Sequence, residues 1–221
     1  MGNTLVKYNY NTPEEVFQKI LFSLGISRSL DNIKKAFVKA EKEAKETNLL
    51  SLSGKIKCED FWYRWNSLVL KHLKVEENKE LPGIIHSKWM KFVDCTLYPE
   101  VREVMSELKR REMKIGLISN AYEEEIDLVL EKADLDRATF DIIVGVDTTR
   151  KVKPNPDIFK YVIGNLNVKL REALFIGDSV DVDYKGAENA GIHALLIDRK
   201  GKQQSSVKTI KNLKEILSQI T

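Results

Sequence analysis

Short apolar runs alternate with amphipathic segments of helix length in the chain after Asp94. Four of these runs have the length of a strand, at 114–119, 140–145, 173–177 and 193–198. Because each run is continuous and apolar, it is typical of a strand that is buried on both faces. Strands that alternate with helices favour a parallel sheet with helices on both faces. We therefore expect an α/β fold for residues 94–221.

The segments between and after the apolar runs predict the helices of this part. The expected helices cover 99–112, 123–132, 156–166 and about 182–190, and a last helix covers about 210–220. Residues 200–208 are expected to form a polar surface loop before the last helix.

Residues 12–93 show a helical pattern instead. Thr12 is expected to cap a helix that starts at Pro13 and stops near Gly25, and Ser29 to cap a second helix up to about Glu46. Two further helices are expected at about 59–73 and 82–93. All three tryptophans and five of the eight phenylalanines lie in this part, which predicts the core of a small helical bundle.

Composition excludes several classes of protein. A hydrophobic fraction of 43% supports a real core, and a net charge of +3 is too balanced to indicate nucleic-acid binding. The two cysteines, Cys58 and Cys95, cannot form the framework of a secreted mini-protein. No apolar stretch approaches the roughly 18 residues of a membrane span, and the first residues do not resemble a signal peptide. We expect a soluble cytoplasmic protein without a nucleic-acid or membrane partner, either a monomer or a homodimer.

Ligands of such sheets bind beyond the carboxyl ends of the strands, so the residues there are candidates for function. Ser119 and Asn120 end the run 114–119; two short polar side chains can hold a phosphate oxygen or form an ordinary turn. Lys153 precedes Pro154, which keeps it out of helical geometry. In this stiff loop Lys153 either neutralises a phosphate or is a solvated charge.

The loop after 173–177 is acidic, with Asp178, Asp181 and Asp183 in close succession. Carboxylate oxygens are ligands that Mg²⁺ prefers, so this loop is a candidate metal site. In the other interpretation, Asp178 or Ser179 caps a helix and Asp181 is a solvated acid of its first turn.

The order of these elements resembles the haloacid dehalogenase-like hydrolase superfamily. Ser119-Asn120 is similar to its second motif, Lys153-Pro154 to its third, and Gly177-Asp178-Ser179 with Asp183 to its fourth. The resemblance is close over residues 98–198. It implies a Rossmann-like core in 94–221, an inserted alpha-helical cap in 12–93, and a segment 1–11 that holds the remnant of the first motif and leads into the cap.

The resemblance also implies an activity and roles for residues. It implies a Mg²⁺-dependent phosphatase that acts on a small phosphorylated metabolite through an aspartyl-phosphate. Asp178 would be a metal ligand, and Lys153 and Asp183 would be catalytic. The phosphate would be bound by a set of four residues, Thr4, Ser119, Asn120 and Lys153.

The first motif departs from the family pattern, which is an apolar strand that ends in Asp-x-Asp-Gly-Thr. Gly2-Asn3-Thr4 resembles the end of a variant of it, so Gly2 takes the place of the second acid, the general acid/base. The nucleophile, with the first core strand, would lie just before Met1. We expect the natural chain to start upstream and residues 1–221 to have little or no activity; the alternative is a complete relative without the nucleophile.

Two other functions stay open. One is a dehalogenase that attacks carbon instead of phosphorus, although the acidic fourth motif favours phosphoryl transfer. The other is a non-catalytic relative that binds a phosphorylated ligand with Lys153 and the surrounding polar groups.

Overall fold

The parallel strands predicted for the second half of the chain are present in two separate sheets. β3 (Gly116–Ile118) pairs in parallel with β4 (Ile142–Val144). β5 (Leu174–Gly177) pairs in parallel with β6 (His193–Ile197), and β6 pairs with β7 (Thr209–Ile210). These pairings, in a computed structural model that describes residues 1–201 and 207–220, confirm the predicted α/β fold.

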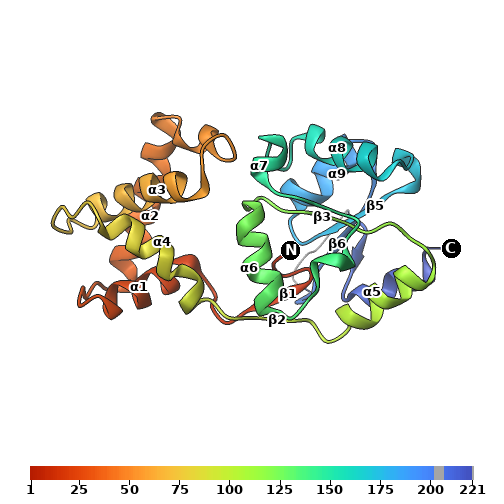
Figure 1. Ribbon diagram of the computed structural model, residues 1–221, viewed down its shortest axis with the longest axis horizontal. Helices are drawn as coiled ribbons and strands as arrows, with labels where there is room; N and C mark the ends of the chain where they lie inside the picture. The colour runs from red at the N-terminus through yellow and green to blue at the C-terminus, as the bar shows by residue number, and fades with distance from the viewer. Residues whose placement is uncertain (202–206, 221) are drawn as a thin grey trace. The chain divides into compact units, whose positions relative to one another are not determined.

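The chain divides into two compact units, one of residues 1–7 and 95–221 and the other of residues 8–94. In the first unit, α8 and α9 lie on one side of the strands and α5 on the other (Figure 1). Its α-helices are α5 (Val101–Arg110), α6 (Glu123–Lys132), α7 (Val146–Thr149), α8 (Pro156–Leu166) and α9 (Lys185–Asn189). Short 3₁₀ helices cover Arg137–Thr139 and Leu170–Glu172. Phe159 and Val144 are fully buried in the core between these elements.

Two predicted helices of this unit are wrong in part. The segment expected at 210–220 begins as strand β7, because Ile210 pairs with Ile197, and continues as the 3₁₀ helix η5 (Leu213–Ser218). The segment expected at about 182–190 consists of a π-helical turn (Val180–Tyr184) followed by α9. Part of the loop expected at 200–208 lies outside the described residues.

The second unit is helical. Its α-helices are α1 (Pro13–Ser23), α2 (Leu30–Glu46), α3 (Cys58–His72) and α4 (Leu81–Phe92), with a 3₁₀ turn at Leu49–Leu52. Their apolar faces share a core that includes the fully buried Phe17, Ile20 and Ile85. Ser29 caps α2 as predicted, since its hydroxyl accepts from the Asn32 N–H; Thr12 precedes α1 but makes no such bond.

A two-stranded sheet of β1 (Val6–Tyr8) and β2 (Cys95–Leu97) lies where the chain passes from one unit to the other. No helix within 1–201 and 207–220 is both long enough and apolar enough to cross a membrane.

Candidate active site

The loop that carries Lys153 is fixed to the end of β3 by one side chain. Asn120 donates through Nδ2 to the Lys153 carbonyl at 2.9 Å and accepts the Lys153 N–H through Oδ1 at 2.7 Å. Because a single amide binds both backbone groups of Lys153, movement of this loop along the sheet end would break two hydrogen bonds at once.

The ammonium of Lys153 is held by Asp183, which lies in the π-helical turn that follows β5. Lys153 Nζ lies 2.6 Å from Asp183 Oδ1, and the two side chains are only 7% and 6% exposed. Asp183 Oδ2 accepts the N–H groups of Asp178 and Ser179, both at 3.1 Å. Both oxygens of Asp183 therefore accept hydrogen bonds, and this carboxylate fixes the position of the Lys153 ammonium. The centre of the Phe175 ring lies 5.3 Å from Nζ.

Gly177 makes this arrangement possible. A Cβ atom at Gly177 would lie 2.4 Å from the Cβ and Cγ atoms of Asp183, closer than real Cβ contacts come. The last residue of β5 must therefore be glycine for Asp183 to turn back over the strand end and reach Lys153.

Asp178 differs from the other two acids of its loop. It is exposed, and its Oδ2 accepts a hydrogen bond from Asn3 Nδ2 at 3.1 Å. Asp181 instead pairs with Lys185 one helical turn later, at 2.7 Å, and its side chain is 80% exposed. Of the three carboxylates, Asp178 alone combines exposure with a place beside the Lys153–Asp183 pair, so it is the one that can offer an oxygen to a metal ion.

The first residues of the chain complete this site. Thr4 is buried and lines one cavity together with Lys153 and Asp183. Met1 lines the same cavity, and burial, followed by the Lys153 charge, lowers the pKa of its α-amine from 8.0 to about 6. The charges of Asp183 and Asp178 oppose this decrease.

Arg199, just after β6, holds this N-terminal segment. Its Nε donates to the Asn3 carbonyl at 3.0 Å and its Nη2 to the Thr4 carbonyl at 2.6 Å. Its guanidinium also lies 3.4 Å from the centre of the Tyr98 ring and pairs with Glu100 at 2.8 Å. Arg199 thus determines where Asn3 meets Asp178.

Glu100 is buried with Arg199 and stays ionised. Burial raises its pKa, but hydrogen bonds from its own N–H, from Arg199 and from the Leu213 N–H, together with the Arg199 charge, outweigh burial and lower the pKa. The Leu213 N–H lies 3.3 Å from Glu100 Oε1, so this carboxylate joins the start of α5 to η5.

The structure thus gathers most of the residues singled out in the sequence. Asn120, Lys153 and Asp183 are linked by hydrogen bonds, Asp178 lies beside them, and Thr4 lines the same cavity. Ser119 directly follows β3, where its N–H donates to the Val144 carbonyl at 3.0 Å. Gly2, expected at the place of an acid, forms a bridge with Val6 and brings no carboxylate.

Three residues of the site were missed in the sequence: Asn3 as a partner of Asp178, and Arg199 with Glu100. Arg199 follows the strand-length run 193–198, so its place at a strand end was a usable signal. The contacts of Arg199 and Asp178 with Asn3 join positions 196 and 175 residues apart, and no local pattern reports them.

Curated relatives match part of the chain. It is 34% identical over 94 residues to pyrophosphatase PpaX of Bacillus cereus (strain B4264), which covers 42% of this chain and 43% of that protein. It is 30% identical over 114 residues to pyrophosphatase PpaX of Bacillus anthracis (strain A0248), or 52% of each. The matched region spans about half the length of these curated relatives.

Solved structures share the fold over nearly all of the chain. A HAD phosphatase from Thermococcus onnurineus superposes with a TM-score of 0.64 at 23% identity, covering 99% of this chain and 94% of that one. A 2-haloacid dehalogenase from Pseudomonas syringae superposes with a TM-score of 0.69 at 17% identity, covering 99% and 96%. The model of the haloacid dehalogenase-like hydrolase family matches residues 66–197, more than half of the sequence. The chain therefore belongs to the haloacid dehalogenase-like hydrolase family.

Proposed function

We propose that this protein is a Mg²⁺-dependent phosphatase that hydrolyses a small phosphorylated metabolite through an aspartyl-phosphate. The observation that carries the proposal is the buried Lys153–Asp183 pair, held by Asn120 at the ends of two parallel strands beside the exposed Asp178. The names of the relatives, a pyrophosphatase and a HAD phosphatase, agree with phosphoryl chemistry.

Each residue of the site has a role in this proposal. Lys153 neutralises charge on the transferring phosphoryl group, because a cation in a site shielded from water stabilises an anionic transition state strongly. Asp183 is a positioning residue that keeps Lys153 in place. The phosphate oxygens are bound by Ser119, by the backbone of Asn120 and by Thr4. The helical unit of residues 8–94 is proposed as the cap that selects the substrate.

The donor groups at the site fit Mg²⁺. This ion requires oxygen ligands, keeps several waters, and is usually bound by one or two carboxylates together with substrate phosphate. Asp178 is an exposed carboxylate with one oxygen bound to Asn3 and would hold the ion. When bound, Mg²⁺ would neutralise charge on the phosphoryl oxygens.

The nucleophile in this proposal is an aspartate on a segment that precedes Met1. Its carboxylate oxygen would form a bond to phosphorus while the bond from phosphorus to the leaving oxygen breaks, and water would then hydrolyse the acyl phosphate. The position of Met1 supports this, since its α-amine lies near Lys153, Asp183 and Asp178. A residue joined to Met1 would enter the site at the phosphate-binding groups. The two cysteines are buried thiols, which agrees with action in the cytoplasm.

The test begins with the reading frame upstream of the Met1 codon, which should encode an apolar strand that ends in aspartate. The product with this segment, and residues 1–221 as the reference, are then assayed for phosphate release from a panel of phosphorylated metabolites, with and without Mg²⁺. We expect Mg²⁺-dependent release by the longer product and little or none by residues 1–221.

Other outcomes would replace the proposal. Halide release from 2-haloacids without a need for Mg²⁺ would make the protein a carbon–halogen hydrolase. Tight binding of phosphorylated ligands without turnover by either product would make it a non-catalytic binder. Robust Mg²⁺-dependent turnover by residues 1–221 would show that no upstream aspartate is needed.

A further inference from the structure

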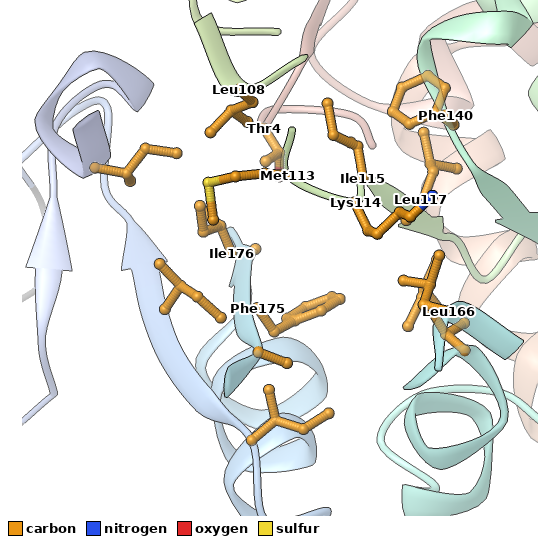
Figure 2. A pocket seen from close by; sticks show the side chains of 18 of the residues that line it. Thr4, Leu108, Met113, Lys114, Ile115, Leu117, Phe140, Leu166, Phe175 and Ile176 are labelled. Atoms are coloured by element: carbon orange, nitrogen blue, oxygen red, sulfur yellow. The ribbon is translucent and has the colours of Figure 1, made fainter. Parts of the chain in front are cut away.

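Two cavities of the first unit differ in their place relative to β5. The first extends between β5 and β3, and Figure 2 shows Ile176 of β5 and Leu117 of β3 in its lining. The strand proposed upstream of Met1 would lie there. The second cavity, of about 730 Å³, lies where β5 pairs with β6, and its lining includes the paired residues Leu174 and His193. A ligand of the second cavity therefore leaves the unpaired edge of β5 to the proposed strand.

Three basic residues line the second cavity, and each belongs to the amino end of a different strand. Arg171 lies in the 3₁₀ helix before β5, His193 is the first residue of β6, and Lys208 directly precedes β7. Because these strands are parallel, their amino ends lie at the edge of the sheet opposite to the Lys153–Asp183 pair. The second cavity is therefore separate from the candidate active site.

The basic groups of this cavity are not neutralised by the protein. Within residues 1–201 and 207–220, Arg171, His193 and Lys208 form no ion pair. Two carboxylates also line the cavity: that of Glu172 is in an ion pair at 3.3 Å, whereas that of Glu188 has no basic partner in the same part of the chain. The three basic groups favour an anionic ligand, and Glu188 can accept a hydrogen bond from a donor on that ligand.

One buried hydroxyl in the lining has no partner in the protein. Tyr184 is only 7% exposed, and its hydroxyl makes no hydrogen bond to any residue that the structure describes. Buried polar groups are usually hydrogen-bonded, because the loss of water without a replacement costs free energy. An oxygen atom of a ligand in this cavity would give the Tyr184 hydroxyl an acceptor.

The size of the cavity and its apolar walls suit a small metabolite. Leu174, Ile192 and Leu195 contribute apolar side chains to the lining. Sites for small molecules typically have volumes of about 300–1,000 Å³, mostly apolar walls and a few polar groups that fix the orientation of the ligand. A flat apolar ring can therefore lie against these walls while a charged group meets the basic residues.

We infer that this cavity binds a small organic anion that has an apolar ring and a hydrogen-bond donor, the chemistry shared by a nucleoside monophosphate and an aromatic amino acid. The anionic group lies among the three basic residues and accepts a hydrogen bond from Tyr184. Glu188 accepts one from the donor group of the ligand. The inference goes beyond the proposed function and does not rest on it, because it concerns the opposite edge of the sheet and involves no turnover.

The test uses residues 1–221 without Mg²⁺ and two ligands, adenosine monophosphate and L-tryptophan, which distinguish a phosphate ester from a carboxylate. In nuclear magnetic resonance titrations with at least one of them, the amide resonances of Leu174 and of residues 193–195 should shift until saturation. Adenosine and tryptamine lack the anionic group and should bind about tenfold or more weakly. A product that carries the proposed upstream strand should give the same shifts.

Two pairs of variants locate the binding groups. Lys208→Gln removes a charge from the lining, whereas Lys211→Gln removes one just after β7, outside the lining. The first should weaken binding about fivefold or more and the second less than about twofold. Tyr184→Phe removes only the buried hydroxyl and should weaken binding about threefold or more. Its control is Tyr161→Phe in α8, which lies outside the lining, is 42% exposed and should leave binding unchanged.

Several outcomes would overturn the inference. Shifts confined to Asn120 and Lys153 would place the ligand at the candidate active site, and shifts confined to Ile115 and Leu117 would place it in the first cavity. Absence of saturable binding of both ligands, equal binding of the uncharged comparators, or equal effects within each pair of variants would contradict it as well. Because none of these measurements involves phosphate release, a failure here leaves the proposed phosphatase activity to its own assay.

Discussion

At the scale of single residues, the candidate site depends on a buried ion pair. Lys153 and Asp183 have lost almost all contact with water, and each compensates the other at 2.6 Å. Desolvation of two ions costs free energy that the pair regains only with good geometry and additional hydrogen bonds. The two backbone amides on Asp183 Oδ2 supply these bonds. A protein that needed only stability here could use apolar residues, so the pair points to function.

Replacing Lys153 should therefore destabilise the fold strongly. Lys153→Met leaves Asp183 buried without its cation, and we expect a loss of about 3–5 kcal/mol in the free energy of unfolding, measured in urea by circular dichroism. Lys185→Met is the matched control, since it removes a lysine–aspartate pair with side chains that are 58% and 80% exposed. The control should change the free energy by less than about 0.5 kcal/mol. Equal effects would show that burial of the Lys153 pair is not what the structure indicates.

At the scale of elements, the site is made by strand ends that turn back on themselves. The π-helical turn after β5 brings Asp183 over Gly177, and Asn120 joins the end of β3 to the loop of Lys153. Each connection is short, but it depends on a particular residue for steric or hydrogen-bonding reasons.

Gly177→Ala tests the contact between β5 and the turn. Its added methyl group would overlap Asp183, and we expect a loss of about 1–3 kcal/mol in unfolding free energy together with displacement of Asp183. Gly164→Ala in α8 is the control: a Cβ there meets no atom within 4 Å, and alanine favours the helix by about 0.5–1 kcal/mol. Opposite signs for the two substitutions are expected in urea unfolding; a neutral Gly177→Ala would contradict the close approach.

The link between α5, η5 and the N-terminal segment predicts a pH dependence. The pKa of Glu100 is lower in the folded protein than its usual 4.5, so Glu100 stabilises the fold above about pH 4.5 and this contribution is lost as the pH falls through the folded pKa. The unfolding free energy of Glu100→Gln should lie below that of the unmodified protein at pH 6, and the difference should shrink toward pH 3.

Glu103→Gln serves as the control for this series. Its side chain is 62% exposed and pairs with Lys214 at the surface, so its effect should stay below about 0.5 kcal/mol. A difference for Glu100→Gln that is constant from pH 6 to pH 3 would contradict the role of its charge.

At the scale of the whole molecule, two apolar cores share no residue. The core of the helical unit includes Ile20 and Ile85, and that of the sheet unit includes Phe159 and Leu196. All three tryptophans lie in the helical unit, at positions 62, 65 and 89, so tryptophan fluorescence reports on this unit.

We expect the two units to respond separately to core substitutions. Ile20→Ala should lower the stability seen by tryptophan fluorescence by about 2–5 kcal/mol, while amide exchange in β5 and β6 stays unchanged. Ile158→Ala in α8 should instead speed amide exchange in β5 and β6 and leave the stability seen by tryptophan fluorescence unchanged. Coincident shifts by both probes would show that the units unfold as one.

Most of the fold could be predicted from the sequence because local patterns determine most of its elements. The bounds predicted for α6 and α8 match the structure, since caps, proline and apolar spacing are local signals. The prediction of a helix at 210–220 was wrong in part, because the pairing of Ile210 with β6 is a long-range contact that overrides helical spacing. For the same reason the acidic loop and Lys153 were visible in sequence, whereas the Asp178–Asn3 bond and the Arg199 contacts were not.

The central proposal is that Asp178 and the Lys153–Asp183 pair form a metal-assisted phosphate site. The most direct measurement is the rate of Mg²⁺-dependent phosphate release by a product that carries the proposed upstream strand, compared with its Asp178→Asn and Asp181→Asn variants. Both aspartates are exposed and belong to one loop, but Asp181 is paired with Lys185 away from Lys153. We expect a loss of about 100-fold or more for Asp178→Asn and less than about twofold for Asp181→Asn. Equal rates for the two variants would contradict this proposal.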